Sequence, residues 1–215
     1  MEAVVDESLR LLNEFLSAPA LAAEIQRGKD EFYARTGAPL PGEPLMEARL
    51  ASFAEWFAFD RMLDATGRTP VEEYMRLHAD ELTGSRLEVF RGFTRTVHSI
   101  FQLKKRENGS GLLVDLYTLR KYPEVRRVPP TLHVDDVAEL RVCPANGAWF
   151  ATDAFCYHPF SARKTILKLM KDARKKGEPL VPLIERLMVM NTRYERYPKT
   201  AKEKAYDINV FSASV

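Results

Sequence analysis

The stretch VCPANGAWFATDAFCYHP, residues 142–159, decides how the centre of this chain folds. Asn146 and Gly147 separate two apolar runs, and an Asn-Gly pair favours the two-residue type I′ turn of a β-hairpin. With that turn, Ala145 opposes Ala148 and Cys143 opposes Phe150. The stretch therefore predicts two paired strands, 137–143 and 148–157, joined at the Asn-Gly pair.

Side chains alternate between the two faces of a strand, so the hairpin also sorts its residues. The face predicted to cover the core carries Ala138, Leu140, Val142, Trp149, Ala151 and Phe155. The opposite face carries Glu139, Arg141, Thr152, Cys156 and His158. Because Trp149 and Phe155 are large and apolar, the hairpin's predicted work is structural.

A metal site is the alternative interpretation, because the stretch holds both cysteines and one of the four histidines of the chain. Zinc would hold each sulfur about 2.3 Å away, but six strand residues place Cys143 and Cys156 roughly 20 Å apart. The same separation excludes a disulfide. Cys156 and His158 remain as a pair, with no orienting acid or oxyanion hole to mark a nucleophile. We expect no metal, no cofactor and no catalytic residue, and the role of this pair stays open.

Outward from the hairpin, the chain reads as a small β unit over 96–159. A second Asn-Gly turn, Asn108-Gly109, joins two β-rich runs, and Pro123 with Pro129-Pro130 confines the following strand to an edge. The predicted strands are 97–105, 112–119, 122–128, 137–143 and 148–157. Five short antiparallel strands predict a sheet or an SH3-like small barrel.

The region before it, 1–95, reads as helices. Val5, Leu9, Leu12 and Leu16 recur at the spacing of one buried helix face. A loop rich in proline and glycine, 36–44, precedes a wide apolar helix from Met46 that Gly67 is expected to stop.

Two helix starts in this region carry cap signals. Thr69, Pro70 and Glu72 have the spacing of a capping box, and Ser85 with Glu88 repeats it.

The chain ends with two basic helices over 160–198 and a tail over 199–215. The first is expected to start at Ser161 and to stop at Gly177. Together, the fold class is α+β: an N-terminal helical region, a central five-stranded antiparallel unit and C-terminal basic helices.

Charge is divided unevenly along the chain. Residues 1–90 hold 9 basic and 17 acidic residues (net −8), residues 91–159 are net +3, and residues 160–215 are net +7. Two interpretations remain open. The basic end can pack on the acidic end of its own chain, or it can meet an anionic partner.

The helix 163–176 is the best candidate for a binding site. Its basic residues are Arg163, Lys164, Lys168, Lys171, Arg174, Lys175 and Lys176. Lys164, Lys168, Lys171 and Lys175 share one helix face, which suits phosphates or an acidic protein. Arg126 and Arg127, with Lys104-Lys105-Arg106, could extend this patch across the β unit.

Several classes of function are disfavoured. The chain has no apolar run of 18 residues, its acidic start is unlike a secretory signal, and two cysteines suit the reducing cytoplasm. It lacks a P-loop, a G-x-G-x-x-G turn and a nucleophile elbow. We therefore expect a non-enzymatic cytoplasmic binding or adaptor protein that acts on a protein partner. The alternative is a nucleic-acid-binding protein that uses helix 163–176. The oligomeric state is open.

The run EWFAFDRMLDATGRTPVEEY, followed by SIFQL and GLLVDL, resembles uncharacterised bacterial proteins found beside SEC-C annotations. The resemblance covers roughly 50–159 and implies a helical front followed by a small β unit. The cysteine-rich metal-binding tail of SEC-C proteins is absent, so it implies no metal and no functional residue.

Overall fold

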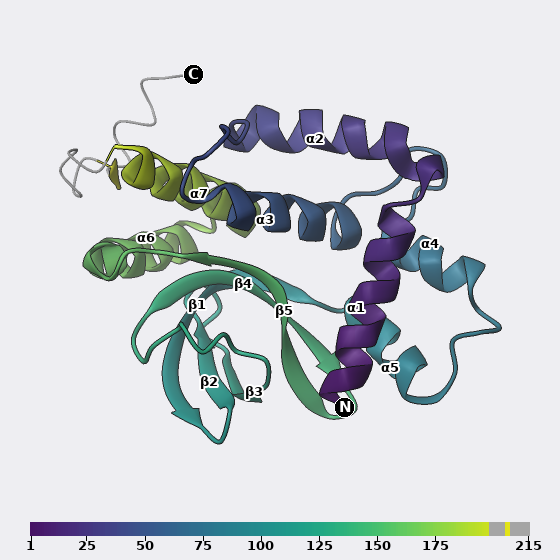
Figure 1. The fold of residues 1–215 in the computed structure, drawn as a ribbon. Helices are drawn as coiled ribbons and strands as arrows, with labels where there is room; N and C mark the ends of the chain where they lie inside the picture. The colour runs from purple at the N-terminus through teal and green to yellow at the C-terminus, as the bar shows by residue number, and fades with distance from the viewer. Residues whose placement is uncertain (198–204, 207–215) are drawn as a thin grey trace.

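The computed structural model describes residues 1–197 and 205–206, and it has the predicted α+β architecture (Figure 1). The N-terminal helices are α1 (Glu2–Leu16), α2 (Ala22–Thr36), α3 (Met46–Phe59), α4 (Pro70–Leu77) and α5 (Gly84–Phe93). The strands are β1 (Val97–Glu107), β2 (Ser110–Asp115), β3 (Lys121–Val125), β4 (Val137–Ala145) and β5 (Ala148–Tyr157). Two helices follow, α6 (Arg163–Lys176) and α7 (Leu180–Arg196). The predicted tail, 199–215, lies almost entirely outside the described residues.

The strands form one antiparallel sheet in the order β3-β2-β1-β4-β5. The sheet is open, so of the two predicted forms the sheet is confirmed and the barrel is wrong. It curves strongly enough that Arg126, just after β3, exchanges backbone hydrogen bonds of 2.9 Å with Trp149 and Ala151 of β5. β3 lies at an edge, as its prolines predicted.

Both Asn-Gly turns are confirmed. Asn108 and Asn146 have φ of 46° and 48°, and the glycines that follow have φ of 78° and 76°. Positive φ at both central residues is the requirement of a type I′ turn. The pairs Ala145–Ala148 and Cys143–Phe150 are as predicted.

The predicted register fails further along the same hairpin. Val142 pairs with Ala151, but Leu140 pairs with Phe155, so extra residues of β5 bulge out between them. In the bulge the Ala154 amide donates to Glu55 of α3 at 2.9 Å, and Asp153 accepts from Arg127. These partners lie far away in sequence, so the Asn-Gly turn could not reveal the bulge.

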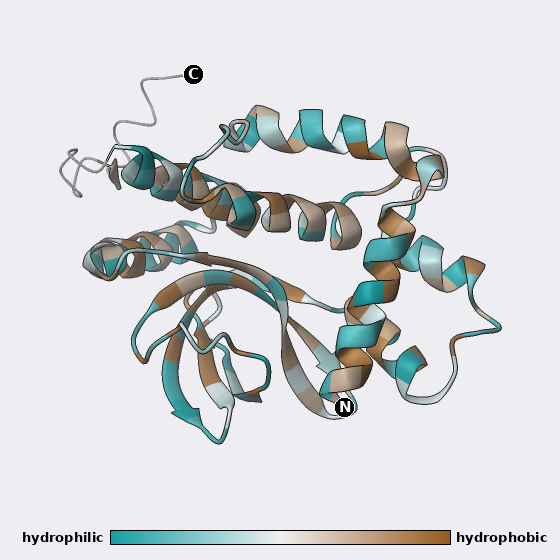
Figure 2. Cartoon of the chain, in the orientation of Figure 1, coloured by the Kyte–Doolittle hydropathy of each residue, from teal (hydrophilic) through white to brown (hydrophobic). Residues whose placement is uncertain are grey.

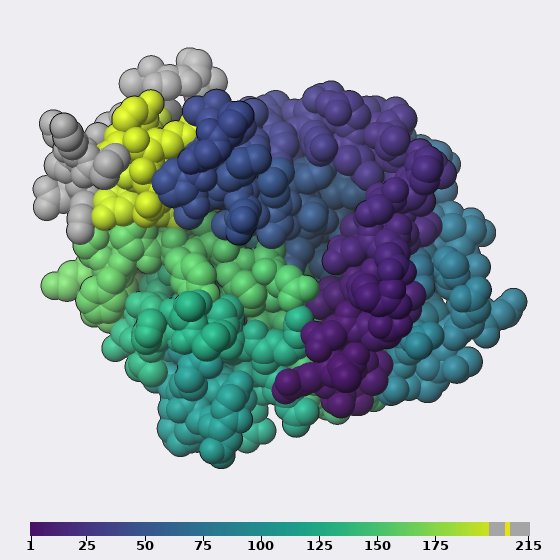
Figure 3. All heavy atoms as spheres, in the orientation of Figure 1, coloured from purple at the N-terminus to yellow at the C-terminus, as the bar shows by residue number. Residues whose placement is uncertain are grey.

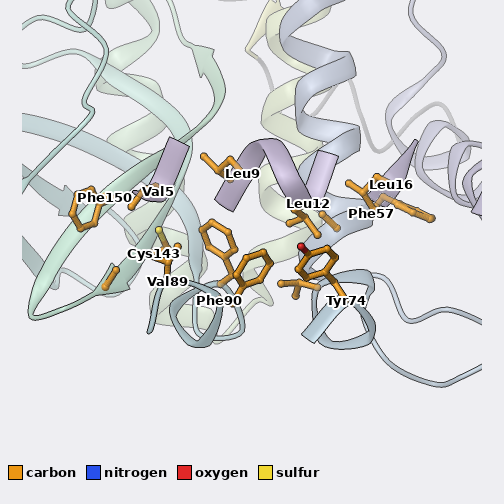
Figure 4. Packing of buried hydrophobic residues seen from close by; sticks show 14 of the residues in the cluster. Val5, Leu9, Leu12, Leu16, Phe57, Tyr74, Val89, Phe90, Cys143 and Phe150 are labelled. Atoms are coloured by element: carbon orange, nitrogen blue, oxygen red, sulfur yellow. The ribbon is translucent and has the colours of Figure 1, made fainter. Parts of the chain in front are cut away.

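The sheet is buried on both faces at β4 and β5. The predicted core face is confirmed: its residues pack in the curve of the sheet with Phe101 and Leu113. The opposite face is buried too. Cys143 and Phe150 pack against α1 and α5, in a cluster that Figure 4 shows with Val5 and Phe90. The helices that cover this face carry both hydrophobic and hydrophilic residues along their length (Figure 2).

The predicted helix ends are correct in part. The capping box at Thr69 is present, with Thr69 and Glu72 each accepting from the backbone N–H of the other. The second one is wrong, because α5 begins at Gly84 and Ser85 lies inside the helix.

Two other predicted ends differ, and one holds. α3 ends at Phe59, well before Gly67, because Arg61 leaves the helix to bind Glu24 and Glu31 of α2. Ser161 lies in a short 3-10 turn, Phe160–Ala162, and does not cap α6. The expected stop at Gly177 is confirmed, since Gly177 adopts the left-handed conformation of a helix C-cap.

Candidate functional site

α6 divides cleanly into an apolar and a basic side. Ile166, Leu169, Met170 and Ala173 are buried in a cluster with residues of α7, including Leu187. The lysines predicted to share a face, Lys164, Lys168, Lys171 and Lys175, are all exposed. We call these four residues the lysine row. At 1.5 Å per residue it runs along about 16 Å of helix axis.

The lysine row has no ion-pair partner among the residues that the structure describes. It does not dock on the acidic N-terminal helices, and the segment that contains α6 lies at the molecular surface (Figure 3, green). The contact between the two ends of the chain is made by α7. Arg196 of α7 binds Glu43, and Glu185 binds Arg35 of α2 at 2.7 Å. The charge asymmetry seen in the sequence is therefore neutralised only in part.

The other basic residues of α6 are occupied by their own chain. The Arg163 guanidinium lies 3.6 Å from Asp135 and stacks over Phe160 at 4.5 Å. Arg174 reaches the carbonyl of Tyr117 at 3.5 Å, and Lys176 lies 3.6 Å from Glu178. These residues tie α6 to its surroundings, so among the basic residues of α6 only the lysine row lacks a partner within the part of the chain that the structure describes.

The structure does not join Arg126 and Arg127 to the lysine row. Arg127 binds Asp153 at 2.6 Å and Asp6 of α1 at 2.9 Å. Figure 1 shows α1 and α6 at opposite ends of the sheet. Arg126 is exposed and stacks over Phe150 at 5.7 Å.

The three basic residues from Lys104 to Arg106 make different contacts. Lys104 lies 3.1 Å from Asp135, the carboxylate that Arg163 also approaches, so it lies near the start of α6. Lys105 pairs with Glu107, and Arg106 donates to backbone carbonyls after β3. The predicted continuous patch across the sheet is thus absent from the described residues.

Cys156 and His158 belong to a buried polar network. Asn191 of α7 donates to the Cys156 sulfur at 3.3 Å and to the Tyr157 carbonyl at 2.6 Å. The Tyr206 hydroxyl donates to Asn191 at 3.1 Å and lies 3.0 Å from His158 Nδ1. This network joins β5 to α7 and to the short described segment 205–206.

Burial keeps Cys156 and His158 in their neutral forms at neutral pH, so they do not form a reactive thiolate–imidazolium pair. It raises the pKa of the Cys156 thiol to about 12 and lowers the pKa of His158 to about 4. Burial also raises the pKa of Cys143 to about 12. Both cysteines are free thiols, and within residues 1–197 and 205–206 no cluster of three metal-ligating side chains occurs.

Two contacts between ionisable side chains were not predicted from the sequence. His98 of β1 contacts the buried Glu139 of β4, with Nε2 and Oε1 3.0 Å apart. Arg141 of β4 makes two hydrogen bonds to Asp60, at the end of α3. The only local signal is a glutamate and an arginine inside an apolar strand. Their partners come from β1 and α3, which the sequence alone does not place beside β4.

In comparisons with known proteins, no family model, no curated protein and no solved structure matches the chain. The resemblance noted for residues 50–159 therefore stays a prediction. None of the helices described here is long and apolar enough to cross a bilayer.

Proposed function

We propose that this is a non-enzymatic binding or adaptor protein whose lysine row docks on an acidic surface of a partner protein. The observation that carries the proposal is the absence of any ion-pair partner for the four exposed lysines within the described chain. The chain pairs most of its other surface charges, including Arg10 with Glu7 and Arg91 with Glu88.

An unpaired row of like charge has a cost to the folded chain, since like charges at i,i+3 and i,i+4 repel. A complementary surface relieves that repulsion and speeds encounter through the field it creates. The affinity would then weaken with salt, because exposed charges are screened over about 8 Å at physiological ionic strength.

Three features support a protein partner over nucleic acid. The exposed row contains lysines only, whereas Arg163 and Arg174, which suit bidentate phosphate recognition, are held within the chain. The row carries no aromatic side chain on which a base could stack. Asp172 adds a negative charge at its flank, which a polyphosphate backbone would repel and a mixed protein surface can match.

We place this activity in the cytoplasm. Cys143 and Cys156 are buried free thiols, and a reducing compartment keeps thiols in that state.

The test is a comparison of two double variants of equal charge change. Lys168→Glu with Lys171→Glu reverses the centre of the row, and Lys105→Glu with Lys121→Glu changes exposed residues of the sheet by the same amount. Each tagged protein is used to recover partners from the native host, with and without nuclease, and a recovered partner is then purified and titrated directly. We expect the first variant to weaken binding at least tenfold and the second to match the original chain.

The outcomes separate the two readings. Capture that nuclease abolishes, followed by direct binding to a short DNA or RNA duplex with a steep salt dependence, would replace the protein partner with nucleic acid. Equal affinity of both double variants for the purified partner would contradict a role for the lysine row.

A further inference from the structure

A cavity of about 210 Å³ lies between the helical layer and the sheet, away from the lysine row. Residues of α2, α3 and α7 line one side of the cavity, and residues at the start of β1 and in the middle of β4 line the other. Its apolar lining consists of Phe32, Trp56, Val181, Ile184 and Met188. Val181 is 56% exposed, so the cavity opens to solvent near the first turn of α7.

Most of the charged groups in the lining are satisfied by a protein partner. Arg141 binds Asp60 through two nitrogens and donates to the Thr96 hydroxyl at 2.8 Å. Glu185 binds Arg35, whose guanidinium also lies 5.0 Å from the Trp56 ring centre. Neither Asp60 nor Glu185 therefore needs a ligand.

Two buried polar atoms of the lining residues lack a hydrogen-bond partner among the described residues: Nε of Arg141, which still lies 3.4 Å from the Glu55 carboxylate, and Oε2 of Glu139. The Glu139 side chain is 2% exposed, and its Oε1 lies 3.0 Å from His98 Nε2. Its Oε2 is buried and has no hydrogen-bond partner among the described residues. A buried carboxylate oxygen without a donor is costly, and such groups in native proteins call for a specific explanation.

We propose that this cavity binds a small organic amine with an apolar body. The amine donates to the unpartnered carboxylate oxygen of Glu139, while the body packs against Trp56, Phe32 and the α7 side chains.

The cavity itself narrows the class of ligand. Its volume corresponds to about seven waters at the density of the liquid, below the roughly 300–1,000 Å³ of pockets for drug-sized molecules, so the ligand is small. The lining holds three carboxyl side chains, Asp60, Glu139 and Glu185, against one guanidinium, Arg141, so an anionic ligand is disfavoured. Glu139 and His98 supply two ligand atoms, too few for a closed metal site.

The test uses three probes with one ring and different head groups: benzylamine, benzyl alcohol and benzoate. Binding is measured by isothermal titration calorimetry at neutral pH, and Trp56 fluorescence gives a second readout at the cavity wall. We expect benzylamine to bind with a Kd near the millimolar range. Benzyl alcohol should bind at least about tenfold more weakly, because it lacks the charged ammonium group that hydrogen-bonds to Glu139. Benzoate should bind weakest.

Two variants locate the binding. Glu139→Gln keeps the size of the side chain and removes its charge, and Ser52→Met fills the cavity from α3 without touching a charged group. Both should lower the affinity for benzylamine at least about tenfold. Glu73→Gln is the matched control, because this largely buried glutamate of α4 is bound to Arg76 and does not line the cavity. It should leave the affinity within about threefold.

The cooperative unfolding of each variant is recorded beside its titration, so a variant that fails to fold is recognised. If Glu139→Gln does not fold, Ser52→Met decides the question alone. No benzylamine binding to the folded original chain at about 10 mM, or equal binding of amine and alcohol, would overturn the proposal. Equal benzylamine affinity of the original chain and Ser52→Met would overturn it as well.

Discussion

Two sets of basic residues in this protein behave in opposite ways. Inside the molecule, Arg49, Arg61 and Arg141 are each at most 5% exposed, and each binds a carboxylate outside its own helix or strand. On the outer face of α6, the lysine row is exposed and pairs with no described residue. The buried arginines hold different parts of the chain together, whereas the lysine row keeps its charge exposed to solvent.

The difference shows that the net charge of a sequence region does not reveal which of its charged side chains form internal ion pairs and which remain exposed. Some acidic residues of the N-terminal region 1–90 pair with buried arginines of the same region, as Glu24 does with Arg61. The basic C-terminal region contributes Arg196 of α7 to Glu43 and keeps the α6 lysines outside. Removing a buried arginine should therefore damage the fold, whereas changing an outer lysine should damage only binding.

The largest expected effect comes from Arg49→Ala. Arg49 is 1% exposed and binds Glu43, and it also donates to the carbonyl of Thr36 at 3.0 Å, at the end of α2. Without Arg49, the buried Glu43 carboxylate keeps Arg196 as its partner, and the Thr36 carbonyl loses the hydrogen bond from Arg49. We expect the free energy of unfolding to fall by about 3–5 kcal/mol, measured by urea denaturation.

Lys175→Ala serves as its control, since it removes an equal charge from the lysine row and should change stability by no more than about 0.5 kcal/mol. A similar small loss for both variants would show that Arg49 does not stabilise the packing of α3 against the end of α2 and the loop that follows it.

The next effect is a dependence of stability on acid at His158. Burial lowers its folded pKa to about 4, while the unfolded chain keeps the ordinary value near 6.5. Protons therefore bind the unfolded chain first as the pH falls. The stability that neutral His158 preserves is complete above pH 6.5 and is lost progressively towards pH 4, where the loss reaches about 3 kcal/mol.

His158→Asn isolates this effect from the carboxylates that also titrate in acid, among them Glu43, whose pKa is lowered by Arg196 and Arg49 against the cost of its burial. Urea unfolding of both proteins at several pH values gives two curves. The original chain should lose more stability than the variant between pH 6.5 and pH 4. Parallel curves would contradict a buried neutral histidine.

Much of the fold could be predicted from local signals, because those signals act over a few residues. Two Asn-Gly pairs placed two hairpins, and Thr69 with Glu72 placed a helix start. The faces of α6 followed from spacing alone. Each of these depends on backbone geometry that neighbouring residues determine by themselves.

The rest depends on contacts between distant segments. The bulge in β5 depends on Glu55 of α3, and the His98–Glu139 pair depends on β4 lying beside β1. The cavity needs side chains of α2, α3 and α7 to come together beside β1 and β4. The sequence carries no local signal for the role of His98, because its partner Glu139 lies 41 positions away.

The smallest effect gives the sharpest contrast with the buried arginines. Lys171→Glu replaces one member of the lysine row by an acid whose helix neighbours at three and four positions include Lys168, Arg174 and Lys175. Repulsion becomes attraction, so we expect the unfolding free energy to rise by about 0.5 kcal/mol in low salt and the gain to shrink as salt is added. Lys171→Gln, which only removes the charge, should gain less. Urea denaturation at two ionic strengths measures both. A loss of stability larger than about 0.5 kcal/mol would mean that Lys171 already has a partner within its own chain. A residue that serves binding alone should behave differently: its replacement should raise the stability of the chain and weaken the binding of the partner.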